Sequence, residues 1–305
     1  MAARVSTDTT SDATNPSAFR TVTADVLGAR FTFAIDPDRL NEAGVVWDNA
    51  VRACAESMAP MIRSTLSASP ARCAGGAGDV SPRVNVLELG AGTGALGIAL
   101  ASIENTRVLV TDLEPVVGLA AANARRNARL KHPTSRVEAG ALPWSLEPGG
   151  VPDPESVFHA TDKNETADRR NERWHFVAAC ETLYWGGWDV FEDDTRAPQL
   201  ATMVEACGHG TRGEKGRFAV LVVAFTVRDK TRETGFVLGA IGDAFWLSRF
   251  DDDDVVDASF ETPDDAAEAS ARARADARAR AYVAGANEGD LLVFRGRLKE
   301  RRRAT

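Results

Sequence analysis

Cysteine and histidine are scarce in this 305-residue chain, and their spacing does not resemble a metal site. The four cysteines (Cys54, Cys73, Cys180 and Cys207) contain no Cys-x-x-Cys pair, and none of the four histidines stands near them at a ligand-like spacing. We therefore expect neither a structural zinc ion nor a disulfide framework. The lack of a disulfide pattern is typical of a reducing, intracellular compartment.

Long apolar runs are also missing. No stretch approaches the roughly 20 apolar residues that a membrane-spanning helix needs. The first residues lack the order of a signal peptide, and Asp8 and Asp12 argue against a transit peptide. We expect a cytoplasmic protein, with the nucleus as a second location, and a disordered tail over residues 1–18.

The chain has no excess of basic residues. Its net charge is -8 and its pI is near 5.2, which argues against a general affinity for nucleic acid or for anionic membranes. With 44% hydrophobic and 26% charged residues, the composition is that of an ordinary globular protein.

Strand-like and helix-like segments alternate along most of the chain. The strand-like segments are residues 84–89, 107–113, 136–142, 175–184, 217–225 and 290–298. Helical patterns separate them, including one at residues 234–246. This alternation predicts a Rossmann-like α/β fold, in which a mainly parallel sheet has helices on both faces. Before it, residues 19–37 predict a short β-hairpin and residues 44–66 a helix.

Two segments interrupt the alternation, so we expect a single domain over residues 19–305 with two inserts. Residues 145–172 are polar and rich in Pro and Gly, which predicts a long loop. Residues 251–284 combine acids with an Ala/Arg run, which predicts a helix that stops near Gly285. Its few large apolar residues favour a solvated helix over a partner-binding arm, so its removal is expected to leave the fold intact.

The segment NVLELGAGTGALGIALA, residues 85–101, joins an apolar strand to a helix through Gly90, Gly92 and Gly94. Glycines at such a turn let a ligand approach the backbone N–H groups, and they permit positive φ angles. The carboxyl edge of an α/β sheet is also where ligands bind. Taken alone, the pattern is compatible with nucleotide-type binding or with a tight structural turn.

Two acids narrow the choice of cofactor. Asp112 ends the next predicted strand, about twenty residues after the glycines, where a carboxylate can accept both hydroxyls of a ribose. Together these features indicate NAD or S-adenosylmethionine. Glu88 stands two residues before Gly90, where it would repel a pyrophosphate but could hold an ammonium or organise the loop. This favours S-adenosylmethionine.

These motifs resemble the seven-strand, class I S-adenosylmethionine-dependent methyltransferases. The resemblance is carried by VNVLELGAGTG (84–94), VLVTDLEP (108–115) and AAANARRN (120–127). More narrowly, GVVWDNA (44–50), ALPW (141–144) and FVAACETLYW (176–185) are similar to the methyltransferase-like-21 group of protein lysine methyltransferases. The first two of these segments, GVVWDNA and ALPW, are especially similar to the branch that methylates valosin-containing protein.

The resemblance implies a set of cofactor contacts. Trp47 would be an aromatic on the cofactor side, and Trp144 would lie against the adenine. The remaining implied contacts are Glu88, Gly90, Ala91, Gly92, Asp112, Leu113 and Cys180. Planar purines and sulfonium cations both favour aromatic faces, which agrees with the two tryptophans. For both tryptophans, packing in the protein interior is the alternative interpretation.

The acceptor side is predicted at Glu181, Tyr184 and Trp185, which end the strand-like segment 175–184. Methyl transfer to an amine needs positioning and a dry, neutral amine rather than an acid catalyst. Glu181 departs from the aspartate that is usual in the group. A similar Glu-Thr-apolar-Tyr order occurs in related protein histidine methyltransferases, so the acceptor could be lysine or histidine.

The predicted function is S-adenosylmethionine-dependent methylation of a lysine side chain in a protein substrate. The implied partner is a protein of the chaperone or AAA-type ATPase class, and the chain is expected to be a monomer. Histidine methylation, small-molecule methylation and a cofactor-binding scaffold without activity stay open. An NAD-dependent oxidoreductase is disfavoured because we find no Tyr-x-x-x-Lys or placed histidine to relay a proton.

Overall fold

The structure is a computed structural model that describes residues 20–68, 82–158, 173–183, 193–208, 218–250 and 266–299. The chain divides into two compact units, up to Pro143 and from Trp144. The seven strands of the main sheet come three from the first unit and four from the second. The predicted seven-strand, mainly parallel α/β class is confirmed. The predicted tail lies outside the described residues.

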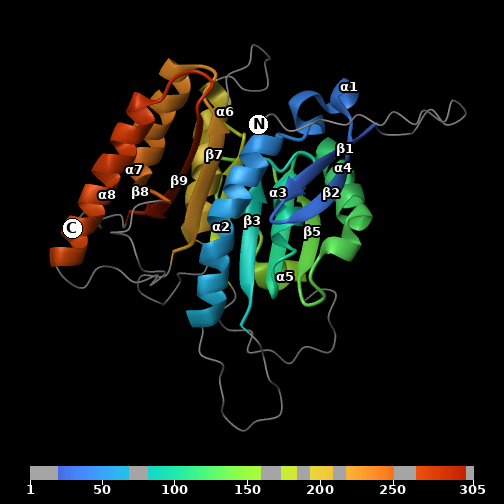
Figure 1. The fold of residues 1–305 in the computed structure, drawn as a ribbon. Helices are drawn as coiled ribbons and strands as arrows, with labels where there is room; N and C mark the ends of the chain where they lie inside the picture. The colour runs from blue at the N-terminus through green and yellow to red at the C-terminus, as the bar shows by residue number, and fades with distance from the viewer. Residues whose placement is uncertain are drawn as a thin grey trace, which may run out of the picture. The chain divides into compact units, whose positions relative to one another are not determined.

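The sheet strands of the first unit are β3 (Val84–Leu89), β4 (Thr106–Asp112) and β5 (Arg136–Ala141) (Figure 1). They pair in parallel with β4 in the middle. Helices α3 (Ala95–Leu100) and α4 (Glu114–Arg126) connect them, and α2 (Asp48–Ala68) packs against β3 and α3. Because the three strands are parallel, their carboxyl ends lie at one edge, where α/β sheets bind ligands.

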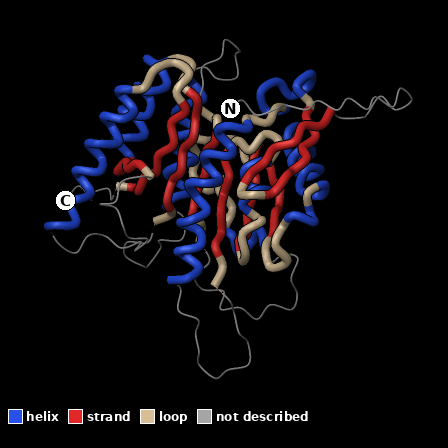
Figure 2. The backbone as a smooth tube through the Cα atoms, viewed as in Figure 1, coloured by secondary structure: helices blue, strands red, loops and turns tan. Residues whose placement is uncertain are grey.

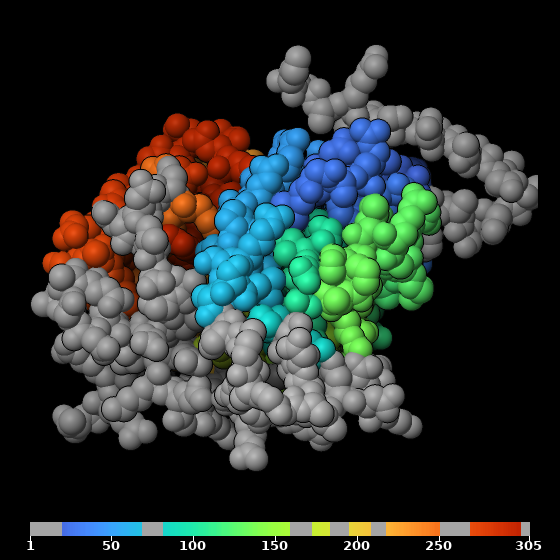
Figure 3. Space-filling view, turned by 60° about the horizontal axis from the view of Figure 1, so that its bottom comes forward, coloured from blue at the N-terminus to red at the C-terminus, as the bar shows by residue number. Residues whose placement is uncertain are grey.

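A β-hairpin precedes these strands, as predicted. Strands β1 (Arg20–Val26) and β2 (Ala29–Ile35) pair antiparallel around a turn at Leu27 and Gly28. Both turn residues have positive φ, 50° and 79°, as a two-residue hairpin turn that matches the strand twist requires. The hairpin lies against α4 (Figure 3). Short helical turns follow at α1 (Pro37–Leu40), η1 (Asn41–Gly44) and η2 (Ala128–Leu130).

The second unit contains β6 (Phe176–Cys180), β7 (Val220–Thr226), β8 (Phe245–Arg249) and β9 (Leu291–Leu298), drawn among the red strands of Figure 2. β6 and β7 are parallel, whereas β9 runs antiparallel to both β7 and β8. Helix α6 (Asp193–Gly208) packs against β6, β7 and β9.

The segment before β8 forms irregular helix. It contains the π-helical stretches η5 (Lys230–Thr234) and η6 (Val237–Ile241) and ends in α7 (Gly242–Ala244). The predicted helix over residues 234–246 is wrong at its end, because Phe245 and Trp246 begin β8. Phe245 is fully buried in this strand, and its apolar character fits a helix and a strand equally well.

The first predicted insert contains more structure than a loop. Helix α5 (Pro154–Phe158) lies within it, and Phe158 packs edge-on against Trp174 with ring centroids 6.1 Å apart. The indole of Trp174 donates a 3.0 Å hydrogen bond to the carbonyl of Pro152. Phe158 and Trp174 are both fully buried, so the end of α5 belongs to the core of the second unit, whereas residues 146–150 of the insert are exposed.

The second predicted insert forms helix α8 (Ala266–Gly285), which ends at the predicted glycine. The expectation that this helix is solvated is wrong, because one of its faces packs on β8. Ala275, Ala279 and Val283 are buried, with at most 2% of each exposed. Small side chains hide this packing in the sequence, because they bury little area each yet let the helix approach the strand closely. Among the helices in the described ranges, none is long and apolar enough to cross a bilayer.

Candidate active site

The loop that follows β3 requires glycine for its own backbone. Gly90, Gly92 and Gly94 have φ angles of 64°, 53° and 76°, in the left-handed region that side chains disfavour. A Cβ atom on Gly92 would lie 2.9 Å from the carbonyl oxygen of Ala43. These two observations explain all three glycines without a ligand. The loop nevertheless leaves Gly90 and Ala91 half-buried rather than covered.

Asp112 at the end of β4 closes this loop. Its Oδ2 atom accepts a 2.7 Å hydrogen bond from the backbone N–H of Gly92, and its Oδ1 atom accepts one of 2.7 Å from Leu113. Burial raises the pKa of the Asp112 carboxyl, while these two backbone donors act in the opposite direction. From the sequence, Asp112 and Gly92 were expected only at the same edge of the sheet. In the structure a hydrogen bond joins them directly.

The residues around Asp112 fit S-adenosylmethionine. Each carboxylate oxygen has one backbone donor and therefore retains a lone pair for a ribose hydroxyl. Asp112 is half-buried, and the neighbouring Leu113 is an exposed apolar side chain at 47%. Asp112 and Leu113 would hold the ribose side of the cofactor, and Gly90 and Ala91 would face its amino acid portion.

Glu88 lies inside β3 and does not reach the surface of the loop. It is 3% exposed, and its Oε2 atom accepts a 2.9 Å hydrogen bond from the backbone N–H of Gly97 in α3. Burial raises the pKa of this carboxyl to about 8. Of its two predicted roles, these contacts support the organisation of the loop and helix rather than contact with an ammonium group.

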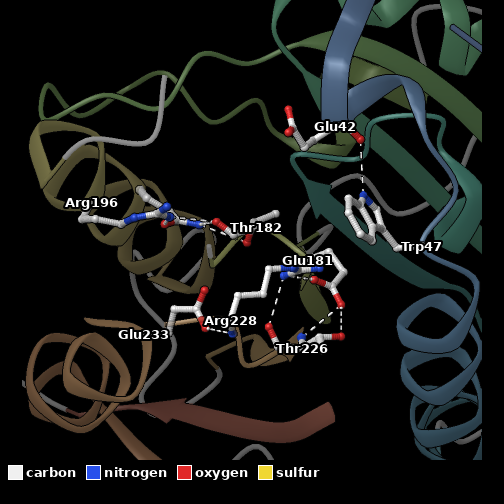
Figure 4. Close-up of polar contacts among 9 residues, drawn as sticks. Glu42, Trp47, Glu181, Thr182, Arg196, Thr226, Arg228 and Glu233 are labelled. Atoms are coloured by element: carbon white, nitrogen blue, oxygen red, sulfur yellow. Dashed lines mark hydrogen bonds and ion pairs between the residues drawn. The ribbon is translucent and has the colours of Figure 1, made fainter. Parts of the chain in front are cut away.

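Trp47 stands immediately before α2. Its indole N–H donates a 3.3 Å hydrogen bond to the carbonyl of Glu42 (Figure 4), and its own carbonyl accepts one of 2.9 Å from Val51 in the first turn of the helix. Trp47 as a whole is half-buried. Its predicted contact with the cofactor stays a prediction.

The other predicted residues belong to the second unit. Trp144 and Cys180 are half-buried, the latter at the end of β6. Tyr184 and Trp185 lie outside the described residues. The structure therefore brings Glu88, Gly90, Ala91, Gly92, Asp112 and Leu113 together around one loop. The predicted contacts of Trp144 and Cys180 with the cofactor remain predictions.

Glu181 follows β6 in a strained backbone conformation, and its side chain is anchored. Its φ angle is 55°, unusual for a residue other than glycine. Oε1 accepts hydrogen bonds from the Thr226 N–H at 3.0 Å and from the Thr226 hydroxyl at 2.7 Å. Oε2 forms a 2.7 Å ion pair with Arg228, and only 2% of the Glu181 side chain is exposed (Figure 4).

The residue after it is held from α6. Arg196 donates a 2.8 Å hydrogen bond to the Thr182 carbonyl, and the Gln199 amide donates to the Thr182 carbonyl and hydroxyl at 3.2 and 3.0 Å. All three residues are buried. Glu181 and Thr182 are thus held from two sides, by Thr226 of β7 and by α6.

The sequence-based prediction missed Thr226, Arg228, Arg196 and Gln199. A signal for the first two was present: both follow the apolar run at 217–225, and the carboxyl ends of neighbouring parallel strands meet at one edge of a sheet. Arg196 and Gln199 gave a weaker signal. Their spacing of three residues places two polar side chains on one face of a helix, but it does not indicate what that face contacts.

Residues 33–156 match the model of a family described as lysine methyltransferase. Among solved structures, the chain is similar to precorrin 8w decarboxylase from Methanobacterium thermoautotrophicum (14% identity, TM-score 0.29), covering 54% of this chain and 66% of that one. It is also similar to an O-methyltransferase family 2 protein from Planctomyces limnophilus (14% identity, TM-score 0.30), covering 62% of this chain and 46% of that one. A third similar structure is the O-methyltransferase of neocarzinostatin biosynthesis, solved with S-adenosylhomocysteine. Its sequence identity is 17% and its TM-score 0.27, and the match covers 47% of this chain and 34% of that one.

At these TM-scores the solved structures carry no argument about the class of enzyme. The assignment to a class of enzyme rests on the family match and on the fold. The chain spans less than half the length of the two O-methyltransferases. The matched residues include the glycine loop and Asp112. The match supports placing the chain among the class I methyltransferases, and the cofactor that it implies is S-adenosylmethionine.

Proposed function

We propose that this chain transfers a methyl group from S-adenosylmethionine to a lysine side chain of a protein substrate. The observation that carries the proposal is the match of residues 33–156 to a lysine methyltransferase family. That segment contains the glycine loop and the Asp112 carboxylate that closes it. The motif at residues 176–185 supports the acceptor side of the proposal.

When bound, S-adenosylmethionine supplies a methyl group on a sulfonium sulfur: the acceptor nitrogen bonds to that carbon, the sulfur keeps the electrons of the broken C–S bond, and the surplus proton of the nitrogen passes to water. The displacement needs alignment and a neutral amine. The residues of this chain therefore act by binding, orienting and excluding water rather than by donating protons.

Glu181 is the proposed contact for the acceptor amine, with Tyr184 and Trp185 beside it in the sequence. An isolated carboxylate would stabilise an ammonium ion and so oppose the reaction. Arg228 neutralises the Glu181 charge at 2.7 Å, which leaves the pair without net charge. A carboxylate in such a pair can accept a hydrogen bond from a neutral amine while favouring its protonation much less.

The test is to incubate the purified chain with a cell extract and isotope-labelled S-adenosylmethionine. We expect the label in a protein band and its recovery as methyl-lysine after hydrolysis. Methyl-histidine would assign the chain to histidine methylation, and label in small molecules alone would end the protein-substrate proposal. Binding of S-adenosylhomocysteine without any transfer would favour a scaffold that has lost activity.

The substrate class and location are also proposals. The similarity of the sequence motifs to enzymes that methylate valosin-containing protein supports a chaperone or AAA-type ATPase as the substrate. We propose that the chain acts as a monomer in the cytoplasm or nucleus. Fractionation of the labelled extract, followed by identification of the labelled band, tests the substrate class directly.

A further inference from the structure

Two asparagines, Asn123 in α4 and Asn127 directly after its last residue, hold the N-terminal hairpin through its backbone. The Oδ1 atom of Asn123 accepts from the Ala34 N–H at 2.6 Å, and its Nδ2 atom donates to the Ala34 carbonyl at 3.0 Å. Asn127 makes the same pair of bonds with Thr32, at 3.0 and 2.9 Å. Both amides are buried, with 0% and 4% exposed. Each amide thus accepts from the N–H and donates to the carbonyl of one β2 residue, as the backbone of a neighbouring strand would.

The two amides are matched to the strand by geometry. Residues four apart on a helix are separated by about 6 Å along its axis, and residues two apart on a strand by about 6.6 Å. Asn123 and Asn127 can therefore each bond one residue on the same edge of β2. Their contacts with β2 are equivalent, but their other contacts differ.

Only Asn123 also reaches the glycine loop. Its Nδ2 atom donates a second hydrogen bond, of 3.0 Å, to the Thr93 carbonyl, which lies between Gly92 and Gly94. The corresponding atom of Asn127 instead bonds the carbonyl of Asn123 in α4, at 2.9 Å. One side chain thus joins β2 and the cofactor loop, and the other joins β2 and α4 alone.

The chain that leaves β2 meets the same loop a second time. The Asp36 N–H, directly after β2, donates a 3.0 Å hydrogen bond to the carbonyl of Gly44. The neighbouring Ala43 carbonyl is the group that a Cβ on Gly92 would approach to 2.9 Å. Moving β2 would therefore disturb the loop from two sides, through Thr93 and through Ala43.

We infer that Asn123 is a positioning residue of the cofactor site, which sets the glycine loop by tying it to the N-terminal hairpin, whereas Asn127 holds only the hairpin. The inference rests on the assignment of S-adenosylmethionine as the cofactor. Because coupling is reciprocal, ligand binding at the loop stabilises the Asn123 contacts with Ala34.

Calorimetric titration of the full chain with S-adenosylhomocysteine tests the inference, with thermal unfolding recorded in parallel. Asn123→Ala and Asn127→Ala each remove two bonds to β2, so both lower the unfolding temperature. We expect Asn123→Ala to weaken binding by about tenfold, the upper range for one hydrogen bond, and Asn127→Ala to change it by less than about twofold. Equal losses in both variants, or unchanged affinity in Asn123→Ala, overturn the inference.

A second measurement uses the unaltered chain, in case Asn123→Ala does not fold. S-adenosylhomocysteine is expected to slow hydrogen exchange at the Ala34 amide more than at the Thr32 amide, and equal slowing at both overturns the inference. Absence of any S-adenosylhomocysteine binding to the unaltered chain would instead reject the proposed function, and with it the cofactor on which the inference depends.

Discussion

The Asp112 carboxylate and the Gly92 amide meet at 2.7 Å, so the acid at the end of β4 and the loop after β3 form one hydrogen-bonded arrangement. A ligand that bonds the free lone pairs of Asp112 therefore contacts a group that already shapes the loop. Binding and loop geometry depend on the same side chain.

Asp112→Ala is expected to weaken S-adenosylhomocysteine binding by at least about tenfold, because hydrogen bonds to a charged group contribute roughly 1.5–3 kcal/mol each. Titration calorimetry measures the effect, and circular dichroism checks that the variant is folded. Glu114→Ala is the matched control, since this exposed acid lies two residues further on, and its affinity should not change. A folded Asp112→Ala variant with full affinity would show that Asp112 serves the loop alone. NAD is expected not to bind.

Glu88 makes stability depend on pH. In the folded chain its carboxyl holds a proton up to about pH 8, compared with an ordinary pKa of 4.5. Between these values the unfolded chain binds fewer protons, so the free energy of unfolding falls as pH rises, by at most about 1.4 kcal/mol per pH unit. Glu88→Gln removes this contribution, and its stability relative to the unaltered chain should rise between pH 5 and pH 8.

Urea unfolding at several pH values measures the Glu88 effect as the difference between the two proteins. Glu104→Gln is the control, because this side chain is exposed. If the difference between Glu88→Gln and the unaltered chain stays constant from pH 5 to pH 8, Glu88 is ionised in the folded protein and the predicted protonation is incorrect.

Helix α8 should stabilise the second unit through Arg280. This side chain pairs with Asp276 at 2.8 Å and donates to the carbonyls of Leu238, at 2.8 Å, and Gly242. Asp276 in turn accepts the Leu247 N–H of β8 at 2.8 Å. Arg280→Ala is expected to lower the free energy of unfolding by about 2–4 kcal/mol, since it leaves the Oδ2 atom of a buried acid and the Leu238 carbonyl without their donor, while the Gly242 carbonyl keeps Lys299.

The matched control for Arg280 is Arg274→Ala on the same helix, where the side chain is exposed and the expected change is within about 0.5 kcal/mol. Chemical denaturation compares the two variants. Deletion of residues 251–280 should likewise destabilise the unit, contrary to the expectation from composition. Equal stability of Arg280→Ala and Arg274→Ala would mean that the α8 contacts contribute little.

Glu181→Gln keeps the size of the side chain but removes its charge. It should depress methyl transfer far more than cofactor binding, which is the separation expected of a group that acts on the acceptor. Glu181→Asp, which restores the residue implied by the resemblance to the methyltransferase-like-21 group, should retain transfer. Label incorporation and S-adenosylhomocysteine titration are measured on the same preparations. Parallel losses of both in Glu181→Gln would assign Glu181 to the fold rather than to the acceptor.

Arg228→Met leaves the Glu181 carboxylate without its cation, which lies 2.7 Å away in the unaltered chain. A carboxylate freed in this way raises the pKa of a nearby amine. The rise of the transfer rate with pH should then shift upward by about one unit, while S-adenosylhomocysteine affinity stays within about twofold. Arg228→Lys keeps a positive charge and should keep the original profile. An unshifted profile in Arg228→Met would separate Arg228 from the acceptor.

Local patterns were sufficient to predict most strands of the sheet. An apolar run such as residues 84–89 is buried along its whole length, so the sequence shows it directly. The signals for the hairpin within residues 19–37 and for the helix end near Gly285 were equally local. The same holds for Asp112, whose position at a strand end depends only on where β4 finishes.

Features that depend on tertiary contacts could not be predicted in this way. The buried face of α8 consists largely of alanines, which carry no amphipathic signal against the alanines of the opposite face. The pairing of Glu181 with Arg228 requires β6 and β7 to be neighbours. The link from Asn123 to Ala34 and Thr93 joins three segments that are distant in sequence, and only the folded chain brings them together.

The spacing of the α4 amides also limits where the hairpin can change in length during evolution. Inserting or deleting one residue between Thr32 and Ala34 would turn one of the two bonded backbone edges away from Asn123 or Asn127, because successive residues of a strand face opposite directions. Added residues at Leu27 and Gly28 would leave both pairs of bonds in place. We therefore expect length variation among homologous hairpins to be confined to their tips.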